Sequence, residues 1–270
     1  MTARLLLLPA PIEPGTALEV LPPATLAAAR QTGYFLAENA RTTRALLREI
    51  GHPRPLAALA VIEIGHHPDP AAIDGWLAPV VRGEQDAAIV AEAGCPAIAD
   101  PGATLVAHAH RLGVPVEPLV GPSAILLALM ASGLDGQRFR FHGYLPRDGA
   151  DLALRLAALE RDSPPDESQV FIETPYRNRR LFDAILAAGS DAARLAVATG
   201  LTGSAASAQM RSLAAWRALD PSKRPPLDRP TVFVLLAGKG QRQAGPRSEL
   251  VKPADRRAPK RRATRSTRSS

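Results

Sequence analysis

The sequence E-A-G-C-P-A-I-A-D-P-G at residues 92–102 places two carboxylates and one thiol among two glycines and two prolines. The prolines fix the backbone angle φ and remove backbone donors, while the glycines let a ligand approach the main chain closely. A plain connection between two elements could have the same composition. The residue types are therefore consistent with a ligand-binding turn and equally with a purely structural turn.

This loop lies between a predicted strand and a predicted helix. Residues 87–91 form a short apolar run, which indicates a buried strand, and residues 104–112 carry apolar side chains at helical spacing. In open α/β sheets, ligands bind at the carboxyl ends of the strands. The predicted elements therefore put the loop where an α/β protein binds its ligand.

Strands and helices alternate along the whole chain. In the first half we expect strands at 5–8, 34–37, 58–64, 87–91 and 114–120, and helices at 23–32, 42–50, 71–82 and 104–112. In the second half we expect strands at 138–145, 169–173, 195–201 and 231–237, and helices at 151–160, 181–188 and 213–219. This order predicts an α/β fold, with a parallel sheet covered by helices on both faces in the first half and a second α/β unit from about residue 137.

Five segments in order resemble one family, the tetrapyrrole methylase superfamily, in its branch of ribosomal RNA small subunit (cytidine-2′-O-)-methyltransferases. Residues 92–102 are similar to D-A-G-T-P-x-I-S-D-P-G in that family. The other four segments are 9–12 against P-T-P-I, 37–47 against A-E-D-T-R-x-T-x-x-L-L, 121–124 against G-P-S-A, and 141–146 against F-x-G-F-L-P. The resemblance implies an α/β fold of two domains with the cofactor cleft between them, S-adenosylmethionine as the cofactor, RNA (ribosomal RNA) as the partner, and a homodimer. With the element pattern and the charge distribution, we predict two domains, 1–136 and 137–238, followed by a disordered basic tail, 239–270.

The resemblance also implies a set of cofactor-binding residues. A sulfonium donor needs a site that holds a cation beside an apolar adenosine, and backbone carbonyls with one or two carboxylates suit that need. The positions that match the family in the first half are Pro11, Glu92, Gly94, Cys95, Pro96, Ile98, Asp100, Pro101, Ser123 and Ala124, and those in the second half are Thr174, Ala198 and Thr231. Pro101 and Ser123 are also ordinary helix starts, so a capping role stays open for them.

Glu38 and Arg41 are the predicted catalytic residues. They match the A-E-D-T-R segment of the family, and a ribose hydroxyl is a poor nucleophile that gains from a positioned base or a nearby cation. Asn39 stands where the family has aspartate, and residues 11–15 and 223–230 also depart from the family pattern near the acceptor. The alternative is structural: Glu38, Arg41 and Arg44 would merely cap the helix start and pair along it.

The charge of the chain is divided unevenly. The net charge is +7, but residues 239–270 carry 11 Lys and Arg against two acidic residues, so the preceding residues sum to 7 − 9 = −2. With few apolar residues, this tail is expected to be disordered, and it either attracts phosphate backbones or merely improves solubility. The single cysteine argues against a disulfide framework, and the longest apolar run, residues 124–131, is too short to cross a membrane. We therefore expect a cytoplasmic protein with no membrane association.

Other motifs are weaker. His66 and His67 are adjacent in a loop and lack the spacing of metal ligands, so no metal is expected. The chain has neither the G-x-S-x-G nucleophile motif nor the G-x-G-x-x-G dinucleotide motif. Arg177, Arg179 and Arg180 could meet phosphate or form the solvated face of a helix. The prediction is a methyltransferase acting on RNA ribose, with a small or tetrapyrrole-like acceptor and a catalytically degenerate RNA-binding relative as the alternatives.

Overall fold

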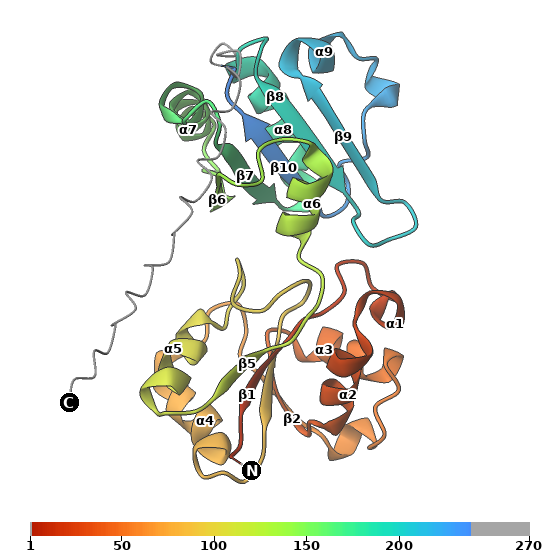
Figure 1. The fold of residues 1–270 in the computed structure, drawn as a ribbon, viewed down its shortest axis with the longest axis vertical. Helices are drawn as coiled ribbons and strands as arrows, with labels where there is room; N and C mark the ends of the chain where they lie inside the picture. The colour runs from red at the N-terminus through yellow and green to blue at the C-terminus, as the bar shows by residue number, and fades with distance from the viewer. Residues whose placement is uncertain (1, 239–270) are drawn as a thin grey trace, which may run out of the picture. The chain divides into compact units, whose positions relative to one another are not determined.

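The computed structural model describes residues 2–238, which belong to one compact unit. The predicted basic tail, residues 239–270, lies outside the described residues. Within 2–238 the chain forms two five-stranded sheets, each built from one half of the sequence (Figure 1). Among the described residues, no helix has the length and apolar character needed to cross a membrane.

The first sheet is parallel, as its sequence pattern predicts. Its strands are β1 (Leu5–Leu8), β2 (Tyr34–Ala37), β3 (Ala60–Glu63), β4 (Ala87–Val90) and β5 (Val116–Pro118). They lie in the order β3-β2-β4-β1-β5, and Leu5 to Leu8 pair with Ala87 to Val90 in register. All carboxyl ends of the strands therefore meet at one edge of the sheet, which brings the loops after β2, β3 and β4 together.

Helices cover both faces of this sheet. Alternate strand residues Leu6, Leu8 and Phe35 pack with α1 (Ala17–Val20), α2 (Pro23–Gln31) and α3 (Ala40–Glu49). The intervening residues Leu5 and Leu36 pack with α4 (Ile73–Val81) and α5 (Ala103–Arg111) on the other face. Because successive side chains of a strand point to opposite faces, the uninterrupted apolar runs of β1 and β2 require this double cover.

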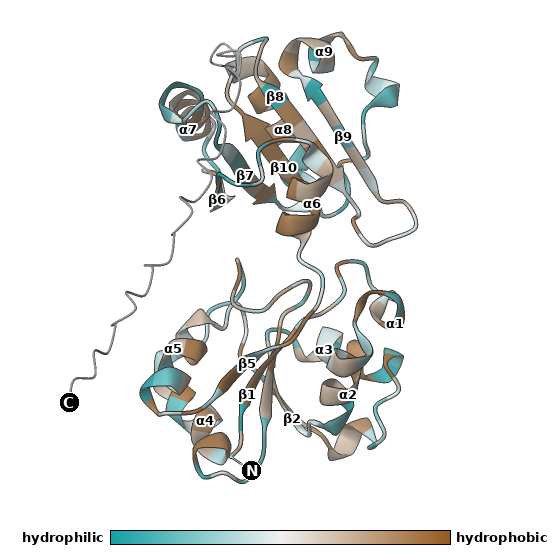
Figure 2. Cartoon of the chain, viewed as in Figure 1, coloured by the Kyte–Doolittle hydropathy of each residue, from teal (hydrophilic) through white to brown (hydrophobic). Residues whose placement is uncertain are grey.

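The second sheet is mixed. Its strands are β6 (Phe139–Tyr144), β7 (Ser168–Glu173), β8 (Arg194–Thr199), β9 (Ser207–Ser212) and β10 (Thr231–Leu236), in the order β6-β7-β10-β8-β9. Only β6 and β7 pair in parallel, and the other three pairs are antiparallel. Phe171, Phe233 and Val197 pack on one face with α7 (Gly149–Asp162), α8 (Asn178–Ala188) and α9 (Leu213–Ala218). Figure 2 shows the apolar character of the central strands.

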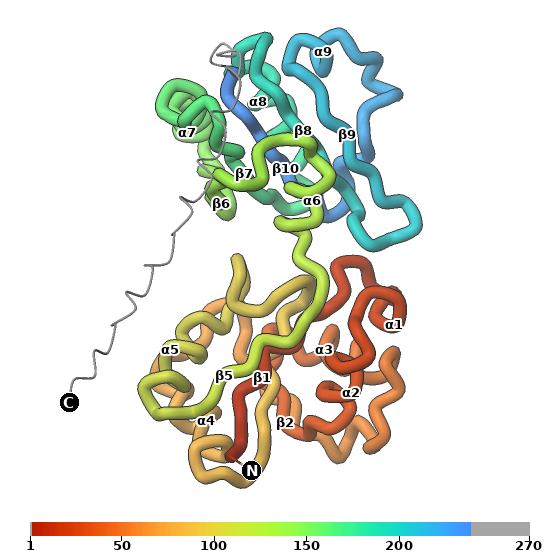
Figure 3. The backbone as a smooth tube through the Cα atoms, viewed as in Figure 1, coloured from red at the N-terminus to blue at the C-terminus, as the bar shows by residue number. Residues whose placement is uncertain are grey.

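Helix α6 (Ala124–Ser132) covers the other face of the second sheet. Its buried residues Ala128 and Leu129 pack against Val170, Ala198 and Val234. Figure 3 traces the chain from β5 through the segment 119–123 into this helix. A domain boundary at residue 136 stays a prediction, but α6, which precedes that residue, belongs to the core of the second sheet.

The helix and strand boundaries differ from the sequence expectation at a few places. Strand β9, with the largely polar sequence S-A-Q-M-R-S, is absent from that expectation, because it lacks an apolar run and gains its order by antiparallel pairing with β8. The helix expected from residue 71 is a short 3-10 turn at Pro70–Ala72 followed by α4. The helix expected from residue 42 begins at Ala40, because the Asn39 side chain caps its first turn.

Candidate functional site

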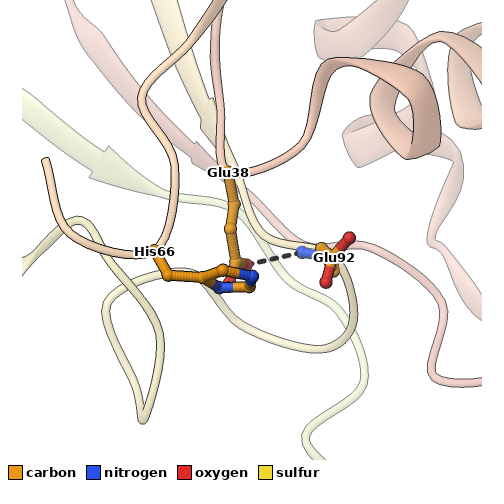
Figure 4. A group of neighbouring side chains, drawn as sticks. All are labelled: Glu38, His66 and Glu92. Carbon is orange, nitrogen blue, oxygen red and sulfur yellow. Dashed lines mark hydrogen bonds and ion pairs between the residues drawn. The ribbon is translucent and has the colours of Figure 1, made fainter.

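The carboxyl ends of three neighbouring strands bring an imidazole and two glutamates together. Glu38 follows β2 directly, His66 lies three residues after the end of β3, and Glu92 lies two residues after the end of β4. Figure 4 shows these three side chains. They are far apart in the sequence, and the strand order β3-β2-β4 places them side by side at the edge where ligands bind in parallel sheets.

Glu38 is held by two hydrogen bonds. Its side chain is 4% exposed, Oε1 lies 2.6 Å from Nδ1 of His66, and Oε2 accepts a hydrogen bond of 2.9 Å from the Glu92 main-chain nitrogen (Figure 4). A buried carboxylate is costly unless its oxygens are paired, and here both oxygens have partners. The two hydrogen bonds therefore hold the Glu38 carboxylate in place. Through them, the carboxylate orients the His66 ring and the start of the 92–102 loop.

The 92–102 loop is joined to the loop after β1. Ala10 and Gly94 exchange main-chain hydrogen bonds of 2.9 and 3.0 Å, and Gly94 has a φ of 74°. Ala97 and Ala99 also have positive φ values, 67° and 65°, which are unfavourable for residues with a side chain. Such backbone strain concentrates at functional sites and is maintained by the surrounding structure.

Gly121 lets a third loop approach the first. A Cβ atom at this position would lie 2.4 Å from Cβ of Pro9, closer than any real contact. Ser123, two residues later, caps α6 by accepting a hydrogen bond from the main-chain nitrogen of Leu126. The loops after β1, β4 and β5 are therefore packed together, and this packing shapes the cavities described next.

A cavity of about 240 Å³ lies against these loops and the second sheet. Its wall is mainly apolar, with Ile12, Ile98, Ile125, Ile172 and Leu201, and Asp100 supplies a carboxylate. Nine of the thirteen predicted cofactor-binding residues line this cavity: Gly94, Cys95, Ile98, Asp100, Ser123, Ala124, Thr174, Ala198 and Thr231. We call it the smaller cavity.

A second cavity of about 1040 Å³ adjoins the first. Glu38, His66, Glu92 and Arg147 line it and do not line the smaller cavity. Six residues line both: Ala93, Ala99, Asp100, Tyr144, Glu173 and Thr174. We call it the larger cavity, and the six shared residues show that the two cavities are adjacent.

The other predicted site residues lie outside the smaller cavity. Glu92 and Pro101 line the larger cavity, whereas Pro11 and Pro96 are buried and line neither of the two cavities. Arg41 is exposed on the first turn of α3 and lines neither cavity. The structure thus brings Glu38 to the larger cavity and does not bring Arg41 there.

Asn39 caps helix α3. Its Oδ1 accepts hydrogen bonds of 2.9 and 3.3 Å from the main-chain nitrogens of Arg41 and Thr42. Asparagine and aspartate cap helices about equally well, so the departure from the family's aspartate leaves this local structure intact. Asn39 therefore caps this helix, whereas the Glu38 carboxylate makes no contact with the α3 main chain in the hydrogen bonds described.

Burial controls the protonation of Asp100. Desolvation, helped by the nearby carboxylates of Glu38 and Glu92 and opposed by His66, raises the pKa of this carboxyl to about 7. Burial also raises the pKa of the Cys95 thiol and of the Tyr144 hydroxyl. A cation bound in the smaller cavity would favour the ionised form of Asp100.

Several lining residues were missed from the sequence. Glu173, Tyr144 and Ile12 line the smaller cavity; Tyr144 and Ile12 lie in segments that resemble the family, and Glu173 precedes the predicted Thr174. Glu173 is 6% exposed and pairs with Arg177 at 2.7 Å. The motif matches marked the right segments, but only the fold shows which of their side chains face a cavity.

Glu38, His66 and Glu92 offer one oxygen or nitrogen atom each within 4.8 Å of one another, a spacing that a metal ion could bridge. In this structure, however, the Glu38 oxygens and His66 Nδ1 are already joined by the hydrogen bonds described above. The arrangement has the form of a carboxylate–imidazole pair, and we interpret it so.

The fold defines the class of protein that the chain resembles. Its described part matches the solved structures of uroporphyrin-III-C-methyltransferase from Thermus thermophilus, with a TM-score of 0.54 at 17% identity over 88% of this chain and 93% of that one, and of the methyltransferase CobJ, with a TM-score of 0.56 at 18% identity over 90% and 98%. The predicted α/β fold of the tetrapyrrole methylase type is confirmed. Identity this low supports the fold alone.

Sequence comparison points to a particular branch of that class. Proteins named ribosomal RNA small subunit methyltransferase I are 33% identical in Pseudomonas aeruginosa (59% of this chain, 54% of the relative), 33% in Mesorhizobium japonicum (66% and 56%) and 34% in Thermotoga maritima (55% and 62%). The chain thus spans a little over half the length of these curated relatives. No family model matches the chain. The resemblance deduced from the five segments is confirmed by these relatives.

Proposed function

We propose that this chain is an S-adenosylmethionine-dependent methyltransferase that methylates RNA at a ribose 2′-hydroxyl, with a ribosomal RNA cytidine as the substrate. The observation that carries the proposal is the shared wall of the two cavities. Residues of the family-like segments line the smaller one, and the larger one opens beside Asp100 and Tyr144. The names of the curated relatives support the choice of ribosomal RNA.

The residues of the smaller cavity fit the proposed cofactor. Isoleucine side chains suit an apolar adenosine, Gly94 allows a ligand to approach the main chain, and Asp100 offers a carboxylate for a cation. When bound, S-adenosylmethionine supplies a methyl group on a positively charged sulfur. The second-sheet residues Thr174, Ala198 and Thr231 line the opposite part of the same cavity and would hold the cofactor from that side.

The larger cavity suits an RNA segment. Arg147 lines it, as does Arg177, which is paired with Glu173, and Arg41, Arg179 and Arg180 are exposed on helices α3 and α8. Arginine side chains bind phosphate oxygens and thereby position a nucleic acid without reading its sequence. Holding the ribose hydroxyl in line with the methyl group would supply much of the rate acceleration.

Methyl-label transfer tests this proposal. Purified protein with labelled cofactor should label the small-subunit ribosomal RNA taken from cells that lack the protein, and should label it much less when the RNA comes from cells that contain it. Nuclease digestion should place the label on a ribose. Label on a tetrapyrrole instead of RNA would favour the small-acceptor alternative, and RNA binding without transfer would favour the degenerate one.

We further infer a cytoplasmic homodimer. Leu126 and Met130, one turn apart on α6, are 51% and 78% exposed, and Val120 just before the helix is 71% exposed. An exposed apolar stripe of this kind is typical of a contact between protein chains, and the resemblance to a dimeric family makes a second copy the partner. Met130→Glu should shift the sedimentation coefficient from dimer to monomer, whereas Leu154→Glu, at a 70% exposed position on α7, should leave it unchanged. A wild-type monomer would contradict the inference.

A further inference from the structure

We infer that His66 is the base that accepts the proton of the attacking hydroxyl, and that Glu38 is its positioning residue. The inference rests on the methyl transfer proposed above and assigns a role that the sequence pattern gave to Glu38 itself. It starts from three observations: the 2.6 Å contact of His66 Nδ1 with Glu38 Oε1, the burial of Glu38, and the exposure of His66 to the larger cavity.

The hydrogen bond fixes the tautomer of His66. An ionised carboxylate only accepts hydrogen bonds, so the proton of the neutral ring lies on Nδ1 and Nε2 carries the free lone pair. The His66 side chain is 67% exposed, whereas that of Glu38 is 4% exposed. The imidazole is thus accessible to a substrate in the larger cavity, and Figure 4 shows its ring lying against the Glu38 carboxylate.

Glu38 is poorly placed to take the proton itself. Both of its oxygens already accept hydrogen bonds, one from His66 and one from the Glu92 main chain. Protonating an oxygen would forfeit one of these bonds in a buried site, which is costly. A carboxylate that orients a histidine and stabilises its protonated form is the arrangement that activates hydroxyl nucleophiles in other enzymes.

The proton and electron balance is simple. The ribose O–H bond breaks and its proton moves to Nε2 of His66, while the oxygen forms a bond to the methyl carbon and the methyl–sulfur bond breaks, leaving a neutral thioether. His66 becomes an imidazolium that Glu38 stabilises through Nδ1. Other charged groups lining the larger cavity are Glu92, Asp100, Glu173, Arg147 and Arg177, together with the neighbouring His67. No additional oxidant, reductant or co-reactant is required.

Kinetics of two variants test the role of His66. His66→Ala should lower kcat for methyl transfer roughly a hundredfold or more, the usual range for loss of a general base, with the KM for RNA and the Kd for cofactor within about twofold of wild type. Added imidazole should restore part of the rate to His66→Ala. His110→Ala, at an exposed position on α5, is the matched control and should keep the wild-type rate. Full turnover in His66→Ala would overturn the proposal.

A spectroscopic measurement tests the pair without any reaction. In protein labelled with ¹⁵N-histidine, above the pH at which the ring is protonated, the His66 signals should report a proton on Nδ1, and Glu38→Leu should shift the ring toward the Nε2–H tautomer. His66→Gln assigns the signals by removing them. A wild-type ring protonated on Nε2 would overturn the pairing.

The two failures are distinguishable. If wild-type protein transfers no methyl group to RNA, the proposed function fails, and the catalytic role of His66 fails with it. If wild type transfers and His66→Ala transfers equally fast, only the role of His66 fails. Because Glu38→Leu could disturb folding, its melting curve is recorded, and the His66→Ala kinetics decide the question in any case.

Discussion

Glu173 and Arg177 form an ion pair of 2.7 Å at the junction of β7 and α8, with side chains 2% and 16% exposed. The other Glu173 oxygen, Oε1, accepts hydrogen bonds from the main-chain nitrogen and the hydroxyl of Thr174. Arg177 therefore differs from Arg179 and Arg180, which are exposed. Arg177 is therefore the one of these three arginines that pairs with a buried carboxylate, that of Glu173, which lines both cavities.

Arg177→Ala should destabilise the protein more than the loss of a surface charge would. Removing one partner of a buried pair leaves an uncompensated charge, which costs about 3–5 kcal/mol in well-buried cases, and the partial exposure of Arg177 places the expected loss near the lower limit. Arg179→Ala removes the same charge from an exposed position and should cost less than about 0.5 kcal/mol. Urea unfolding of both variants measures the difference, and equal midpoints would contradict the buried pair.

Gly94→Leu should weaken cofactor binding at least tenfold, because Gly94 lines the smaller cavity and the added side chain would compete with the ligand for the approach to the main chain. Gly94 has a φ of 74°, so part of any effect could come from backbone strain. Gly113→Leu is the matched control, because its φ is 71° and it lines neither cavity. Calorimetric titration should show a loss of cofactor affinity only for Gly94→Leu. Equal affinities of the two variants would show that the 92–102 loop does not bind the cofactor.

Asp100→Asn should stabilise the protein above neutral pH. The folded pKa of about 7 lies above the value of about 3.9 for an unfolded chain, so the folded state binds more protons at intermediate pH. The stabilising contribution of Asp100 is complete below about pH 3.9 and is lost as the pH rises through about 7. Allowing for solvent screening, we expect a melting temperature higher than wild type by roughly 2–4 °C at pH 8 and nearly equal at pH 4.

Asp148→Asn is the control for this pH dependence. Main-chain hydrogen bonds from Asp151 and Ala150 lower the pKa of Asp148, so its contribution has the opposite sign: it is present above the unfolded pKa and is lost as the pH falls. The two variants should therefore change stability in opposite directions at pH 8. A difference for Asp100→Asn that does not vary with pH would show that its carboxyl titrates normally.

Removing the charge of residues 239–270 should weaken RNA binding most at low salt. These residues carry 11 basic and two acidic side chains, and each phosphate that a basic side chain neutralises adds to the salt dependence of binding. A chain of full length with these Lys and Arg residues replaced by Gln should show a shallower slope of log K against log salt, by about 0.7 for each phosphate that is no longer neutralised. An unchanged slope would mean that the segment only improves solubility.

Much of the fold was predictable from local patterns. Apolar runs such as Leu5–Leu8 and Ala87–Val90 are buried strands, as their patterns predict. The local sequence pattern did not predict a strand that is stabilised by pairing with a neighbouring strand. Ser207–Ser212 is a strand because β8 supplies hydrogen-bond partners, a relationship that its own composition does not reveal.

The candidate site likewise has features that the local sequence predicts and features that depend on the fold. The glycines, prolines and acidic residues of 92–102 marked a ligand-binding loop by their types alone, since backbone freedom and charge are local properties. The partnership of Glu38 with His66 was not visible, because 28 residues separate them and the adjacent histidines lacked a recognisable spacing. Only the strand order β3-β2-β4 places His66 beside Glu38, since adjacent parallel strands carry their following loops to one edge of the sheet. Sequence therefore determined which residues could do chemistry, and tertiary structure decided that a histidine would meet the buried carboxylate.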